Sequence, residues 1–82
     1  MLPWRLHPQV ALRPEEFGAL AYHYGNRRLV FLKSETLVAL VSALGDFDSA
    51  QDALAAMVEA PERHRYEVAL SRLAQSGVIC AR

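Results

Sequence analysis

The hydrophobic pattern of residues 19–33 predicts a β-hairpin. Two runs rich in β-branched, aromatic and aliphatic side chains flank Gly25-Asn26, a pair that favours a tight turn between antiparallel strands. A two-residue turn pairs Tyr24 with Arg27. All later pairings in the hairpin follow from this register.

This register divides the hairpin into two faces, and the face with the larger side chains is predicted to point inward. Its members are Leu20, Tyr22, Leu29 and Phe31. An isolated two-stranded ribbon is marginal in water, so the rest of the chain is expected to cover this face. A two-residue turn also directs the amides of Arg28, Val30 and Leu32 away from the other strand of the hairpin. That edge is left open, as either a liability or a binding site for an added strand.

A shorter alternating run precedes the hairpin. Val10 and Leu12 alternate with polar or small residues, which predicts a first strand that Pro14 ends. Trp4 and Leu6 are expected to lie across the sheet or over a helix end, where they enlarge a small core.

Apolar residues at helical spacing predict three helices in the rest of the chain. The signals for helix ends are, in chain order, Ser34 and Gly45, then Ser49 with Asp52, then Pro61 and Gly77. Gly45 is expected to stop its helix in the left-handed conformation, and Gly77 is expected to end the third helix. The predicted fold class is α+β and winged-helix-like, a three-stranded antiparallel sheet followed by three helices in one domain (residues 1–82).

Composition narrows the classes of function. The chain has 82 residues, 52% of them hydrophobic and 22% charged, as in a small globular domain. Nine basic residues balance nine acidic ones, which counts against a nucleic-acid partner because DNA-binding domains are usually basic. Cys80 has no cysteine to pair with, which fits a cytoplasmic protein. With neither a secretory signal nor an apolar run long enough to span a bilayer, no membrane partner is expected.

The residue types that carry catalysis do not form a recognisable group. His7, His23 and His64 are scattered, without carboxylates or cysteines at the spacing of a metal site. His23 is expected to be a surface or half-buried side chain of a strand. Glu15-Glu16 lies on a turn where both carboxylates are expected to be solvated. We therefore predict no catalytic residues, no metal site and no cofactor.

The third predicted helix has a distinctive flank. At about 100° per residue, Arg65, Ala69, Arg72 and Ser76 fall along one side of its inward stripe. One interpretation is a solvated surface with two ordinary arginines. The other is the wall of a binding groove, in which small side chains leave room and guanidinium groups bind carboxylates. The spacing alone leaves both open.

The run from Trp4 to Ser34 resembles the mycofactocin biosynthesis chaperone family, which belongs to the PqqD-like peptide-recognition domains. The most specific part is HPQVALRPEEFGAL, residues 7–20. The resemblance implies a non-catalytic chaperone that binds the leader of a ribosomally made precursor peptide. It also implies that the chaperone presents the peptide to a radical S-adenosylmethionine (radical SAM) maturase.

In related domains the leader is added as a strand to the third strand, beside the third helix. Together with the helix flank inferred from spacing, this gives a predicted set of peptide-binding residues. They are Arg28, Leu29, Val30, Phe31, Leu32, Lys33, Arg65, Ala69 and Arg72.

Two other uses of this fold are left open. A winged-helix transcriptional regulator would read DNA with the third helix and use the hairpin as its wing, although the neutral charge and the apolar hairpin argue against it. Alternatively, the open third strand pairs with that of a second copy in a homodimer.

Overall fold

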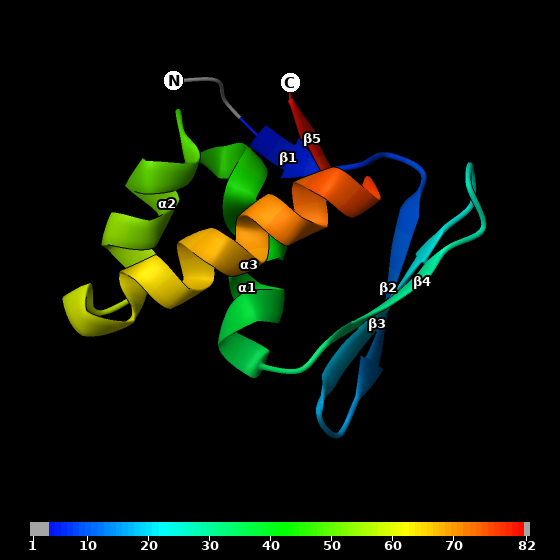
Figure 1. Ribbon diagram of the computed structural model, residues 1–82, viewed down its shortest axis with the longest axis horizontal. Helices are drawn as coiled ribbons and strands as arrows, with labels where there is room; N and C mark the ends of the chain where they lie inside the picture. Colours follow the sequence, from blue (N-terminus) through cyan, green and yellow to red (C-terminus); the bar gives the residue numbers. More distant parts are fainter. Residues whose placement is uncertain (1–3, 82) are drawn as a thin grey trace.

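The computed structural model describes residues 4–81. Its elements are, in chain order, β1 (Trp4–Leu6), β2 (Val10–Glu15), β3 (Gly18–His23), β4 (Leu29–Leu32), α1 (Glu35–Ala43), a 3-10 turn (Leu44–Asp46), α2 (Ala50–Met57), a second 3-10 turn (Ala60–Glu62), α3 (Arg63–Ser76) and β5 (Ile79–Ala81). Figure 1 shows the sheet of β2, β3 and β4 standing to one side of the helices. The predicted α+β order is confirmed, with a pair of terminal strands added.

The three-stranded sheet is antiparallel, with β3 in the centre and β2 and β4 at its edges. Its register places Tyr22 opposite Leu29 and Leu20 opposite Phe31, as predicted. The predicted end of the first strand at Pro14 is wrong, because β2 continues to Glu15. Proline is tolerated there since an edge strand has one side without ladder bonds.

The predicted two-residue turn is also wrong. The His23 amide donates to the Arg28 carbonyl oxygen at 3.0 Å, so a four-residue loop from Tyr24 to Arg27 joins the two strands. The Arg27 amide donates to the His23 carbonyl oxygen at 2.7 Å, and Arg27 has a left-handed φ of 60°. The longer loop keeps the residue pairing but reverses which pairs are hydrogen-bonded.

The inward face of the hairpin is the opposite of the one predicted. Leu29 and Phe31 are 58% and 59% exposed. The buried residues are Ala19, Ala21, His23 and Leu32. The size of the side chains therefore does not predict which face of this hairpin is buried. Small alanines on the inner face let the sheet lie close to the helices.

His23 is buried at 6% exposure, contrary to the prediction of a surface or half-buried side chain. Its Nδ1 accepts hydrogen bonds from the amides of Gly25 (3.0 Å) and Asn26 (3.2 Å). The imidazole therefore supplies acceptors that the hairpin turn lacks, and this local role accounts for a polar side chain on the inner face.

Most of the helix-end predictions are confirmed. Ser34 Oγ accepts the Leu37 amide at 3.2 Å, and Ser49 Oγ accepts the Asp52 amide at 3.1 Å. Gly77 ends α3 with a φ of +84°. Gly45 is not the predicted left-handed stop, because α1 ends at Ala43 and a 3-10 turn carries the chain onward.

The core lies between the inner face of the sheet and the three helices. Its largest fully buried side chains are Leu32, Leu40, Val41, Leu44 and Val78. Trp4 and Leu6 lie in β1, which pairs with β5 at one end of the helices (Figure 1), and both pack against the core as predicted. Within residues 4–81, none of the helices has the length and apolar character needed to cross a bilayer.

Candidate functional site

The two edges of the sheet differ in how many backbone donors they offer. On β2, the Val10 amide donates to the His7 carbonyl oxygen at 2.9 Å, and Pro14 has no amide hydrogen. That leaves Leu12 as the outward donor of this edge, since residues of an antiparallel strand alternate in direction. Local bonds and proline thus protect the β2 edge from pairing.

The β4 edge is open. Because the Arg28 carbonyl points toward β3, the backbone groups of Val30 and Leu32 also point toward β3. The amides of Leu29, Phe31 and Lys33 therefore point outward. The predicted outward set of Arg28, Val30 and Leu32 is wrong, and the four-residue loop is the reason.

Basic side chains lie at both ends of this edge. Arg27 and Arg28 precede β4, Lys33 follows it, and all three are exposed. The ion pairs described within residues 4–81 join Arg13 to Glu15 and Arg65 to Glu62, and neither includes these three cations. The edge is therefore suited to a strand that carries carboxylates.

Two side-chain contacts join helix α3 to residues that flank β4, one at each end of the strand. Asn26 Nδ2, in the hairpin loop, donates to the carbonyl oxygen of Ser76 at 3.5 Å, at the helix C-terminus. Near the helix N-terminus, the hydroxyl groups of Ser34 and Tyr66 lie 3.1 Å apart. These two contacts set the position of the β4 edge relative to α3.

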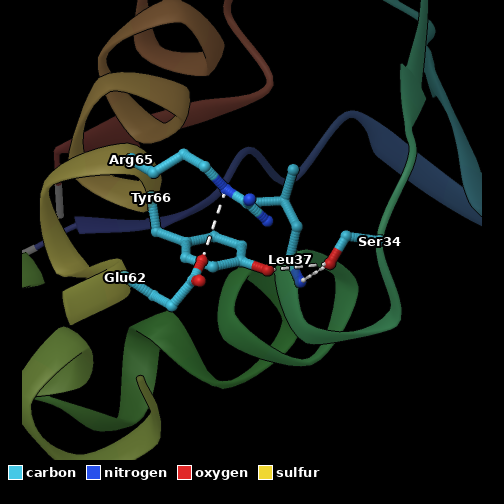
Figure 2. A network of polar contacts seen from close by, with 5 residues as sticks. All are labelled: Ser34, Leu37, Glu62, Arg65 and Tyr66. Atoms are coloured by element: carbon cyan, nitrogen blue, oxygen red, sulfur yellow. Dashed lines mark hydrogen bonds and ion pairs between the residues drawn. The ribbon is translucent and has the colours of Figure 1, made fainter. Parts of the chain in front are cut away.

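The Ser34 end is the more extensive contact, as Figure 2 shows. Ser34 Oγ already accepts the Leu37 amide, so its own proton is available to Tyr66 Oη. This hydrogen bond, with a smaller contribution from the Arg65 guanidinium, lowers the pKa of Tyr66 below its ordinary value and outweighs the opposing effect of burial. Arg65 lies 5.3 Å above the Tyr66 ring and forms an ion pair with Glu62 at 3.5 Å.

The structure brings most of the predicted residues to this side of the molecule. Tyr66 contacts Ser34 and the Ser76 carbonyl contacts Asn26, and helical geometry places Ala69 between them, half-buried. Arg65 and Arg72 border this flank and are exposed. Leu32 is the exception, because its side chain is fully buried and its amide faces β3.

Two hollows lie outside the space between β4 and Ala69. One, of about 360 Å³, separates α2 from α3 on the other side of the helix, with Trp4, Leu54 and Leu70 in its lining. The other, of about 420 Å³, lies where α1 and α3 begin, and Arg65 and Tyr66 contribute to its lining. Arg65 therefore borders this hollow as well as the Tyr66 ring.

Sequence reasoning did not identify Ser34, Tyr66 or Asn26 as residues that position the edge. Ser34 was identified only as a helix cap, and the spacing of apolar residues in the third predicted helix gives Tyr66 no role beyond the core. Within residues 4–81, no group of three or more potential metal-ligating side chains comes together. The arrangement is one for binding an extended chain.

Comparisons with known proteins point to one family. The model of the peptide chaperone MftB family matches residues 3–80. The chain is 49% identical over 80 residues to a peptide chaperone MftB of Mycobacterium tuberculosis, covering 96% of this chain and 73% of that protein. It is 51% identical over 77 residues to the peptide chaperone MftB of Mycolicibacterium smegmatis, covering 93% and 76%. No solved structure matches.

Proposed function

Because the chain belongs to the peptide chaperone MftB family of mycofactocin biosynthesis, we propose that it binds the leader of a ribosomally made precursor peptide by adding it as a strand to β4. The observation that carries this proposal is the open edge of β4, with outward amides at Leu29, Phe31 and Lys33 beside α3. The β2 edge offers fewer donors, so β4 is the better acceptor of a strand.

The cations around the edge favour an acidic leader. Arg28 and Lys33 lie at the two ends of β4, and Arg65 and Arg72 line the helix on the same side. Arginine binds carboxylates well because its planar group offers paired donors. We propose that these side chains select a leader with carboxylates near the ends of the bound segment.

The same charges disfavour pairing of two β4 strands in a homodimer. An antiparallel pair of identical strands with Leu29 opposite Phe31 brings Arg27 of one copy opposite Lys33 of the other. Like charges at opposing positions destabilise a strand pair. We therefore propose that the edge is kept for the peptide. The protein then presents the bound peptide to a radical SAM maturase, while the family assignment gives the DNA-binding alternative no support.

Hydrogen exchange of the backbone amides, measured with and without the cognate leader, tests the docking edge. The amides of Leu29, Phe31 and Lys33 are expected to exchange at least about tenfold more slowly with leader bound, because they gain strand partners. Leu12 on the β2 edge is the internal control and is expected to keep its rate. Protection at Leu12 with none at Phe31 would place the leader on the wrong edge for this proposal.

A further inference from the structure

The face of the sheet that points away from the helices carries an unusual share of exposed apolar surface. Of the exposed large hydrophobic residues within residues 4–81, all but Val68 lie on this face or in its turns: Phe17 (43% exposed), Tyr24 (62%), Leu29 (58%) and Phe31 (59%). Leu20 and Tyr22 of the central strand are half-buried between them. We call these six residues the outer face.

The aromatic rings of the outer face are held in fixed pairs. The Phe17 and Phe31 rings meet edge to face with centroids 5.6 Å apart, and those of Tyr22 and Tyr24 do so at 4.9 Å. Gly18 makes the first pair possible, because a Cβ at this residue would overlap the Leu32 carbonyl oxygen. The turn before β3 therefore passes close to the end of β4 and brings Phe17 beside Phe31.

Such a face is suited to binding protein. Aromatic side chains are the commonest anchors of interfaces, and rings that already hold one another lose little freedom on binding. Arg13 is neutralised by Glu15 at 3.4 Å. Arg27, Lys33 and the carboxylate of Glu16 also lie at the border and leave it with a net positive charge. A matching partner has an apolar surface rimmed by carboxylates.

We propose that the outer face docks a second protein of this kind, and that a peptide bound at the β4 edge completes the docking surface. Alternate residues of an added strand point to opposite faces of a sheet. One set of peptide side chains therefore faces α3, and the other set extends the row of Leu29 and Phe31. This inference rests on the proposed function, under which the second protein is the maturase that acts on the peptide.

The test uses two variants of the outer face that leave the β4 amides in place, Phe17→Ser and Tyr22→Thr. Both are expected to bind the cognate leader within about twofold of wild type, as substitutions outside the edge should. Binding of the purified cognate radical SAM maturase to the protein–leader complex, followed by interferometry, is expected to weaken by about tenfold or more for each. Val68→Ser removes an exposed apolar residue of α3 and is the matched control. It is expected to change neither leader binding nor maturase binding.

A second experiment measures binding of the maturase to wild-type protein without leader. This binding is expected to be weaker than binding to the protein–leader complex, because the docking surface is incomplete without the peptide. Unchanged maturase binding by both variants, with normal leader binding, would overturn the inference and leave the proposed function intact. A concentration-dependent dimer that Phe17→Ser abolishes would also overturn it, since a second copy would then be the occupant. Failure of wild-type protein to bind the leader would instead overturn both proposals.

Discussion

Ser34 shows how much of the site depends on one hydroxyl group. Its oxygen accepts the Leu37 amide and caps α1, while its proton is available to Tyr66 on α3. The residue follows the edge strand directly, so the cap and the inter-element contact both lie at the end of β4. The cap could be predicted from local sequence. The Tyr66 contact could not, because the two residues are 32 positions apart.

Ser34→Ala is expected to raise the pKa of Tyr66 toward its ordinary value, because the first cause of the lowered pKa is lost. An absorbance titration of the phenol, with Tyr66→Phe subtracted, measures this. Ser49→Ala is the matched control, since it removes the cap of α2 at a similar cost of about 1 kcal/mol but has no contact with Tyr66. If Ser34→Ala leaves the pKa of Tyr66 unchanged, the hydrogen bond is not its cause.

The lowered pKa also fixes the sign of a stability effect. Tyr66 loses its proton at a lower pH in the folded chain than in the unfolded chain. Its contribution to the free energy of unfolding is fully present above the unfolded pKa and is lost as the pH falls through the folded pKa. The effect is therefore confined to alkaline conditions and disappears in Tyr66→Phe.

Neighbouring residues of β4 should respond in opposite ways to proline. Val30→Pro removes an amide directed at β3 and leaves a backbone acceptor of Ala21, a fully buried residue, without its donor, at about 1–3 kcal/mol. Leu29→Pro removes an outward amide, so it should keep the fold and weaken leader binding by about tenfold or more. Chemical denaturation and leader titration of both variants measure the two effects. If Leu29→Pro destabilised the fold and Val30→Pro did not, the strand would have the opposite parity.

At the scale of elements, local patterns predicted the order of strands and helices better than their faces. Capping residues mark helix starts because their hydrogen bonds are local, as at Ser49. The inner face of the hairpin was mistaken because it depends on how closely α1 packs on Ala19 and Ala21, which is a long-range property. The unexpected exposure of Leu29 and Phe31 is also what leaves the outer face of the sheet apolar.

The β1–β5 pair shows a different limit of sequence reasoning. β1 and β5 are three residues each and lie at opposite ends of the chain. Strands this short carry little periodicity, and no turn sequence connects them that would predict their pairing. The open β4 edge was predictable from the sequence as an open third strand, but its outward amides were not, because they depend on the length of one loop.

For the whole molecule, the distribution of charge matters more than its total. Positive and negative residues balance at nine each, yet Arg27, Arg28 and Lys33 lie at the two ends of β4, and Arg65 and Arg72 share one flank of α3. A neutral protein with a local positive field attracts an acidic ligand to one side without attracting polyanions over its whole surface. This arrangement suits a chaperone that has to find one small peptide.

Arg72→Glu and added salt are therefore both expected to weaken leader binding. An exposed charge pair contributes about 0.2–1 kcal/mol, so reversing Arg72 should weaken binding by roughly two- to tenfold, with a smaller salt dependence in the variant. Calorimetric titration of the leader at low and high salt measures both effects. Arg5→Glu, a reversal on β1 away from the edge, makes the same change in net charge and is the matched control. Equal weakening by Arg5→Glu would mean that total charge, rather than its place beside β4, governs binding. If leader binding does not depend on salt and Arg72→Glu does not change it, the α3 flank is an ordinary solvated surface without a role in leader binding.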